Sequence, residues 1–599
     1  MTDTESNNQE SAKERDWPWL ISAALVTATA AFLRFFWLGL KPFHHDEGVN
    51  GFFLTTLFRS DIYKYDPANY HGPTLYYIAL AFAKVFGLET IPVRSSVAIF
   101  GVLTVILVLF LKRYIGRIGS LFAALFLALS PGMVFISRYF IHEIFFVFLS
   151  LAIVVSVLFF LEKRKAGIFA IIWMALILLV CFLPSALKLG YVWAGENQDA
   201  LWAYRIGSFF LEAVLIFLVI RMLILWNDGR PIYILLASAS AALMFATKET
   251  AFITIGTLLI ACICVWLWQK IRGISPDTYG IDELSSNGLN WAIFRSRIGS
   301  RTDLILIIVA ASLVFIYLSV LFFSSFFTYP EGVQKAFDAY TVWTKTGSKD
   351  HTQNGFWGYL KWGKRIEAPI FLLSAAGTII ALLKARHRFA IFAGFWAFGL
   401  FAAYSIIPYK TPWLALSFLL PMCIVGGYAI NELLASENIK LKISGAVFAV
   451  AAVCVLAYQT YDLNFVRYDD NDLPYVYAHT RREFLDMITE IDRYAEKSGK
   501  GKDAAVQIVS PDYWPMVWYV KDYPKAVFHG SIADSANSEM IVAKKTDQDD
   551  KVIEKYSADY RYVGTYGLRP GVDLVLLVRK DLADSNAKEL YRIREDRDN

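Results

Sequence analysis

The run EIFFVFLSLAIVVSVLFFL, residues 143–161, decides the fold class of this 599-residue chain. A helix that crosses a lipid bilayer needs about 20 consecutive, mostly apolar residues, and this run carries its single charged residue at its first position. About a dozen further runs have a similar character. They span residues 17–40, 94–111, 119–137, 167–187, 203–226, 231–247, 250–268, 303–323, 368–383, 389–407, 412–431 and 443–460. The sequence therefore predicts a polytopic α-helical membrane protein with about 13 transmembrane helices.

The composition agrees with this fold class and excludes others. Hydrophobic residues make up 56% of the chain and charged residues 19%, and the mean hydropathy is +0.44. Soluble domains carry about 25% charged residues. The net charge is only +5, without the concentrated basic face that nucleic-acid binding needs. The five cysteines all lie in apolar runs, so we interpret them as packing residues.

The basic loops predict the orientation. Lys and Arg gather in the connections 112–117, 163–165, 269–302 and 384–388, and loops of this kind stay on the cytoplasmic side. All four fall on one side if the short run 74–88 lies on the membrane surface as an interfacial helix. The loop 324–367, with six Lys and Arg, falls on the other side, but the charge rule is weaker for a long loop. The amino terminus is then cytoplasmic and the carboxyl terminus extracytoplasmic, in a cytoplasmic (inner) membrane.

Three domains follow from this map. Residues 1–16 are expected to form a disordered cytoplasmic tail, residues 17–460 the membrane domain, and residues 461–599 an extracytoplasmic α/β domain. A cleavable signal peptide is the alternative for the first run, but its apolar stretch is too long for a signal core. In the last domain we expect a helix near 480–498 and strands at 504–510, 516–520, 539–545 and 573–580.

The segment HHDEGVNGF, residues 44–52, follows the first predicted span. It places the carboxylates of Asp46 and Glu47 beside the imidazoles of His44 and His45 at one membrane boundary. Such a group suits general-base chemistry near a lipid headgroup, or a divalent metal ion held by the two histidines. The alternative is a solvated loop whose charges have no joint role.

Further ionisable residues stand at other helix ends on the same predicted side. Charges beside apolar helices are costly, so each needs a reason. Cations and helix ends that converge on one face suit a lipid phosphate, whereas turns in solvent and side chains that reach lipid headgroups are the alternatives. These residues are His71 in YHGPTLYY, Arg138, His142 and Glu143 in SRYFIHEIF, Lys248 and Glu249 in ATKETAF, and Lys410 in PYKTPWL.

Together these segments resemble the GT-C superfamily of membrane glycosyltransferases. An Asp-Glu pair after the first span, a Pro-containing interfacial segment and Ser-Arg before an acidic residue are similar to the protein mannosyltransferase and aminoarabinose lipid A transferase branches. HHDEGVNGF and PYKTPWL look more like the flippase-activity-associated subfamily. The resemblance covers roughly residues 17–460 and departs from the usual pattern at His71, Glu143, Glu249 and Thr250.

The resemblance implies a function. A sugar would move from a polyprenyl-phosphate donor to an acceptor glycan, lipid or protein at the outer face of the membrane. Asp46 would be the general base, supported by Glu47, and some relatives also use a divalent metal ion, for which His44 and His45 are the candidates. Substrate binding would fall to His71, Arg138, His142, Glu143, Lys248, Glu249 and Lys410.

Two other functions stay open at this point. A lipid-linked sugar flippase or transporter would use charges along a path through the bilayer, commonly with repeated halves. A flippase-associated, non-catalytic membrane protein would only present the outer domain to partners. The charges lie on one predicted face and the sequence shows no internal repeat, which favours the enzyme.

Overall fold

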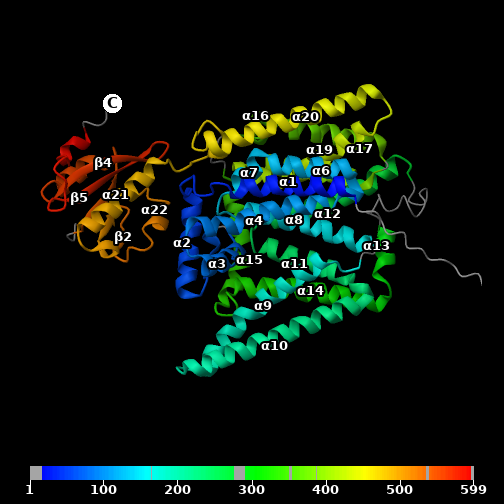
Figure 1. Cartoon of the computed structure of the whole chain (residues 1–599), viewed down its shortest axis with the longest axis horizontal. Coiled ribbons are helices and arrows are strands. Elements are labelled where there is room, and N and C mark those ends of the chain that lie inside the picture. The colour runs from blue at the N-terminus through cyan, green and yellow to red at the C-terminus, as the bar shows by residue number, and fades with distance from the viewer. Residues whose placement is uncertain are drawn as a thin grey trace, which may run out of the picture.

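The computed structural model describes residues 16–69, 71–162, 165–274, 291–349, 354–385, 387–534 and 538–594. The chain forms a long helical bundle with a small α/β domain at one end (Figure 1). The tail predicted over residues 1–16 lies outside the described residues except for its last position.

The membrane part contains helices of very different lengths. In chain order they are α1 (Trp17–Phe35), α2 (His45–Ser60), α3 (Thr74–Phe86), α4 (Thr90–Leu109), α5 (Lys112–Ile115), α6 (Arg117–Leu129), α7 (Pro131–Ser137), α8 (Glu143–Leu161), α9 (Ile168–Ala194), α10 (Gln198–Leu225), α11 (Pro231–Phe245), α12 (Ala251–Ile271), α13 (Trp291–Ile298), α14 (Arg301–Phe323), α15 (Glu331–Gly347), α16 (Gly358–Ile366), α17 (Ala368–Lys384), α18 (Arg388–Ile406), α19 (Leu416–Leu434) and α20 (Ile439–Tyr461).

The predicted membrane fold is confirmed. Among the described residues, nine helices are long and apolar enough to cross a membrane, or up to eleven if the bent pairs α6–α7 and α16–α17 each count as one span. Every run predicted as a span coincides with one of these helices or with the shorter apolar helices α9 and α11. The chain is therefore a multi-pass membrane protein.

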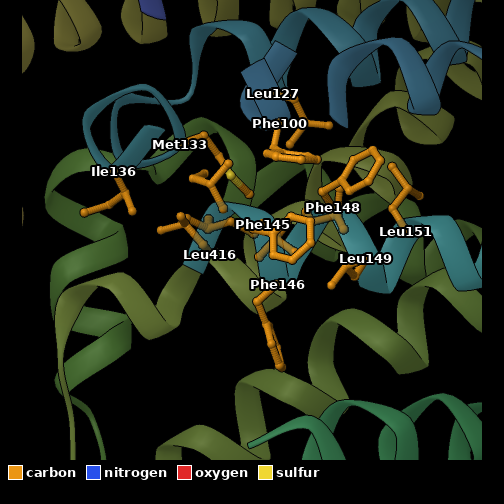
Figure 2. Packing of buried hydrophobic residues seen from close by; sticks show 14 of the residues in the cluster. Phe100, Leu127, Met133, Ile136, Phe145, Phe146, Phe148, Leu149, Leu151 and Leu416 are labelled. Carbon is orange, nitrogen blue, oxygen red and sulfur yellow. The ribbon is translucent and has the colours of Figure 1, made fainter. Parts of the chain in front are cut away.

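Helix α8, formed by the apolar run 143–161, lies inside the bundle. In its most apolar stretch of 18 residues, 83% of the residues are buried. The ring centres of Phe145 and Phe148 lie 4.6 and 5.2 Å from that of Phe100 on α4. Figure 2 shows these rings interdigitating, with Leu127 and Met133 nearby. Because lipid is as apolar as these side chains, close packing rather than water exclusion holds them together.

The basic connections gather at the end of the bundle away from the α/β domain, where α13 also lies (Figure 1). There Arg297 donates to the Leu161 carbonyl at 3.0 Å, and Arg272 donates to the Leu383 carbonyl at 3.1 Å. The predicted grouping of basic loops at one end thus holds for the described residues. Positions 163, 164, 275–290 and 386 of those loops lie outside them.

The α/β domain has one five-stranded sheet in the order β2-β1-β3-β5-β4. The pairs β2–β1 and β1–β3 are parallel, and β3–β5 and β5–β4 are antiparallel. Its elements are α21 (Glu483–Lys497), β1 (Val506–Ile508), α22 (Met516–Tyr519), β2 (Ala526–Phe528), β3 (Met540–Lys544), α23 (Asp549–Tyr556), β4 (Tyr560–Arg569) and β5 (Val572–Arg579).

The predicted small α/β domain is confirmed, with one wrong element. The run 516–520 forms α22 and not a strand, because a short apolar run has no period that separates the two. Strands β2 and β4 did not stand out from the sequence.

The α/β domain packs directly on α2, which lies across the bundle end (Figure 1). Two glycines of α2 allow this close approach: a Cβ atom at Gly48 would lie 2.6 Å from Pro515, and one at Gly51 would lie 2.7 Å from the Trp518 ring. The Trp518 ring also stacks on Phe43 at 4.7 Å. The helix that begins with the HHDE segment is therefore fixed by the α/β domain.

Candidate active site

A cavity of about 360 Å³ opens at the bundle end that carries the α/β domain. Its wall includes five of the residues predicted for the site, which come from three separate segments of the chain. They are His45, Asp46, His71, Lys248 and Glu249. Aromatic side chains complete the lining, among them Trp343, Tyr404, Tyr409 and Trp413. The structure thus joins acids, imidazoles and a cation in one pocket.

Asp46 stands in the first turn of α2, where the sequence makes a capping box. The His44 ring accepts a hydrogen bond from the Asp46 amide at 3.1 Å, and the Glu47 carboxylate accepts one from the His44 amide at 2.9 Å. The Asp46 side chain is 40% exposed and lines the cavity. A carboxylate at this place is stabilised as an anion by the partial positive charge of the helix amino terminus.

Glu47 has a different place from the one predicted. It is fully buried, does not line the cavity, and holds the Arg94 guanidinium with contacts of 2.8 and 2.6 Å. Its Oε1 also accepts the Phe140 amide at 2.7 Å. Arg94 donates further to the carbonyls of Leu38, Lys41 and Pro42. Glu47 is therefore a positioning residue that ties the start of α2 to the preceding loop.

A short backbone ladder brings His71 beside Lys248. The two residues form an isolated antiparallel bridge, and the Gly72 amide donates to the Thr247 carbonyl at 3.0 Å. Only glycine fits at position 72, since an added Cβ atom would stand 2.1 Å from the Ala246 carbonyl oxygen. The departure from the family pattern at 71–72 thus has a structural role.

Lys248 is a buried cation with a buried partner. Its Nζ lies 2.5 Å from Oε1 of Glu143, and both side chains are largely shielded from solvent. Burial lowers the pKa of Lys248, but the Glu143 carboxylate outweighs it and holds that pKa above its ordinary value. The ammonium therefore stays charged at the cavity wall, and Glu143 acts behind it.

Glu249, the next residue in the connection between α11 and α12, lines the same cavity. Burial raises the pKa of Glu249 to about 7, although Lys248 and the Tyr65 hydroxyl, which donates at 3.3 Å, favour its charged form. A carboxyl group that titrates near neutral pH can donate a hydrogen bond to a sugar hydroxyl when protonated, or accept one from it when ionised.

Three further predicted residues, besides His44, Glu47 and Glu143, lie outside the cavity wall. The Arg138 guanidinium donates to the carbonyls of Leu33, Phe36 and Trp37 at 2.6 to 2.9 Å. It therefore caps the carboxyl end of α1 and does not face the cavity, which corrects the predicted phosphate contact.

Lys410 and His142 also lie beside the cavity and not on its wall. Lys410 donates to the Ile407 carbonyl at 2.6 Å and packs against Gly358. The His142 ring is buried 4.5 Å behind the His71 ring, and burial lowers the pKa of His142 well below its usual range.

The histidines do not form a metal centre. Among the residues that the structure describes, no three His, Cys, Asp or Glu side chains are grouped so that they could hold a metal ion. His44 uses both ring nitrogens, since its Nε2 lies 2.9 Å from the Tyr477 carbonyl oxygen while Nδ1 accepts the Asp46 amide. His45 Nδ1 lies 3.5 Å from the Arg569 guanidinium of the α/β domain. These residues do not fit a resident ion.

Several important residues were missed from the sequence. Arg94 begins an apolar run, and its charge there is a signal that could have found it. Tyr65, Tyr404 and Tyr409 carry no such signal, because tyrosine is common at membrane interfaces. Only the fold brings Tyr404 and Tyr409 to the cavity wall and the Tyr65 hydroxyl to Glu249.

Comparisons with known proteins agree with this geometry. Residues 70–192 match the family described as dolichyl-phosphate-mannose-protein mannosyltransferase. The crystal structure of ArnT from Cupriavidus metallidurans in the apo state has a TM-score of 0.53 and 13% identity, covering 95% of this chain and 99% of ArnT. The same protein bound to undecaprenyl phosphate gives a TM-score of 0.51 and 15% identity, covering 96% of this chain and 100% of ArnT.

No curated protein matches the chain by sequence. The similarity to ArnT is therefore one of fold, and the sequence match is confined to the segment that holds His71, Arg138 and Glu143. The chain therefore has an ArnT-like fold, and within it residues 70–192 match the dolichyl-phosphate-mannose-protein mannosyltransferase family.

Proposed function

We propose that the chain transfers a sugar from a polyprenyl-phosphate donor to an acceptor at the outer face of the cytoplasmic membrane. One observation carries the proposal: a single cavity at a bundle end holds the Asp46 carboxylate and the Lys248 ammonium. The first is a base for the acceptor, and the second is a cation for the lipid phosphate that leaves. The residue that was expected to share this second role, Arg138, has no part in it.

The reaction is a single displacement at the anomeric carbon. The acceptor hydroxyl or amine attacks that carbon while Asp46 takes its proton, so that a new glycosidic bond forms. The bond from the anomeric carbon to the phosphate oxygen breaks, and its electron pair stays on that oxygen. Lys248, with His71 beside it, stabilises the negative charge as it develops. Attack opposite the leaving group inverts the anomeric configuration.

The fold supports a lipid phosphate as the leaving group. ArnT, which shares the fold, has been crystallised with undecaprenyl phosphate. The turn that presents Lys248 lies between the apolar helices α11 and α12, which a lipid tail can follow.

The orientation follows from the basic loops. They lie at the bundle end opposite the cavity, and Lys- and Arg-rich short loops remain in the cytoplasm. The cavity, α2 and the α/β domain are then extracytoplasmic.

The test uses undecaprenyl phosphate as a probe, because this leaving group does not depend on the identity of the sugar. The protein is placed in nanodiscs, and binding is measured by native mass spectrometry. Transfer is measured in parallel with polyprenyl-phosphate sugars that differ in the sugar. We expect D46N to bind undecaprenyl phosphate normally and to transfer nothing. The double variant E143Q/K248M removes both charges of the buried pair and should bind the probe at least tenfold more weakly.

Two results would overturn the proposal. One is near-normal transfer by D46N, and the other is unchanged probe binding by E143Q/K248M in protein that is still folded. A wild-type protein that moves lipid-linked sugar across liposomes but transfers none would support the flippase alternative instead.

A further inference from the structure

A second cleft, of about 310 Å³, lies on the other side of the segment before α19. Its walls come from α16, from Pro412, and from the connection 471–477 that leads to the α/β domain. None of the residues assigned to the cavity above lines it. The cleft is therefore distinct from that cavity.

The two spaces are linked through a narrow gap. Asp46 and Trp413 line both the cavity and the gap, and Tyr477 lines both the gap and the cleft. The Trp413 and Tyr477 rings lie 6.0 Å apart and separate the cleft from the Asp46 carboxylate. The gap has a volume of about 10 Å³, room for one water molecule at most. A molecule in the cleft would meet Asp46 once the half-exposed Tyr477 side chain turns away.

The chemistry of the cleft suits an acidic sugar. Lys361 and Arg365 are one helical turn apart on α16 and both exposed, so that their charges add on one face. Arg binds carboxylates and phosphates bidentately. The aromatic side chains of Trp362 and Tyr477 offer flat apolar surfaces with polar tips, and Asn471 adds an amide. Asp472 contributes one carboxylate, against which the two cations leave a positive balance in the cleft.

We propose that this cleft binds the acceptor of the transfer reaction, and that the acceptor is an acidic glycan whose carboxylate or phosphate contacts Lys361 and Arg365. The proposal rests on the proposed function, because the reacting hydroxyl of that glycan would reach Asp46 past Tyr477. The glycan can be free or linked to a lipid, and the chemistry of the cleft is the same for both.

The test measures the binding of a soluble acidic sugar, trigalacturonate, and a neutral one, maltotriose, to the full chain in phosphatidylcholine nanodiscs. The wild type should bind trigalacturonate at least tenfold more tightly than maltotriose. The double variant K361A/R365A should lose about 10- to 150-fold in affinity for trigalacturonate, since a hydrogen bond to a charged group contributes about 1.5–3 kcal/mol.

The matched control is K364A. Lys364 is an exposed cation of the same helix that does not line the cleft, so K364A should bind trigalacturonate normally. Undecaprenyl phosphate binding should be unchanged in K361A/R365A. Repeating the measurement in phosphatidylglycerol nanodiscs separates a glycan site from a lipid-headgroup site.

Three results would overturn the inference. They are equal binding of the two sugars, an equal loss in K364A, and loss of trigalacturonate binding when the nanodiscs contain phosphatidylglycerol. Failure of this inference is distinguishable from failure of the proposed function. If undecaprenyl phosphate binding still depends on Lys248 while trigalacturonate does not bind, only the acceptor site is wrong.

Discussion

The pairing of Glu143 with Lys248 makes a sharp prediction about pH. In the wild type the carboxylate lies 2.5 Å from the ammonium and holds the pKa of Lys248 above its ordinary value against the effect of burial. The variant E143Q keeps the shape of the side chain and removes this charge. Burial then acts alone, and buried lysines without a partner titrate up to about 3–5 pH units below their ordinary value.

In the proposed function, the Lys248 ammonium contacts the lipid phosphate. The ammonium binds phosphate only when protonated, so binding in E143Q is intact below the new pKa of Lys248 and is lost as pH rises through it. A hydrogen bond from a charged donor contributes about 1.5–3 kcal/mol, which corresponds to about 10- to 150-fold in affinity. We therefore expect the ratio of E143Q to wild-type affinity for undecaprenyl phosphate to fall by about this factor at high pH.

The assay is native mass spectrometry in nanodiscs over pH 6 to 9, with both proteins at each pH so that titration of the phosphate itself cancels. The matched control is E249Q, which removes another carboxylate of the cavity but leaves the partner of Lys248 in place. Its affinity ratio should not depend on pH above the pKa of Glu249, about 7. A ratio for E143Q that is constant across this range would refute the reasoning.

Two further predictions concern the parts that hold the site in place. E47Q should lower the melting temperature clearly, because breaking one side of a buried ion pair costs about 3–5 kcal/mol. The control E89Q changes an exposed carboxylate and should leave the melting temperature within error of the wild type. Equal melting temperatures for the two variants would refute the positioning role of Glu47. G72A should weaken undecaprenyl phosphate binding, since its methyl group must push the backbone at His71 away from Lys248. The control G207A, at a position with open space around it, should bind normally. Normal binding by G72A in thermally stable protein would show that this ladder does not shape the phosphate site.

The membrane fold could be predicted from the sequence because its signal is local. An apolar run such as 143–161 has to be a helix in lipid, whatever its neighbours are. The same reasoning failed at 516–520, where five apolar residues fit a strand or a helix equally well and packing of Trp518 against α2 decides the outcome.

The site could be predicted only in part, for a related reason. Charged residues at helix ends are visible in the sequence, and five of them do line one cavity. The direction in which each side chain points is not visible. Arg138 and Glu47 have the expected residue types at the expected boundary, yet both point into the protein, where they satisfy carbonyl and amide groups.

This inward use of charge explains how the Asp46 carboxylate can be held firmly at the cavity. Asp46 sits on a helix end whose first turn is fixed by the His44 cap, by the buried pair of Glu47 with Arg94, and by Pro515 of the α/β domain against Gly48. Each contact involves a different part of the chain, so no single loop movement can displace the carboxylate. The costly buried charges around the cavity are therefore best understood as the support of one exposed acid, Asp46, which lines the same cavity as His71 and Lys248.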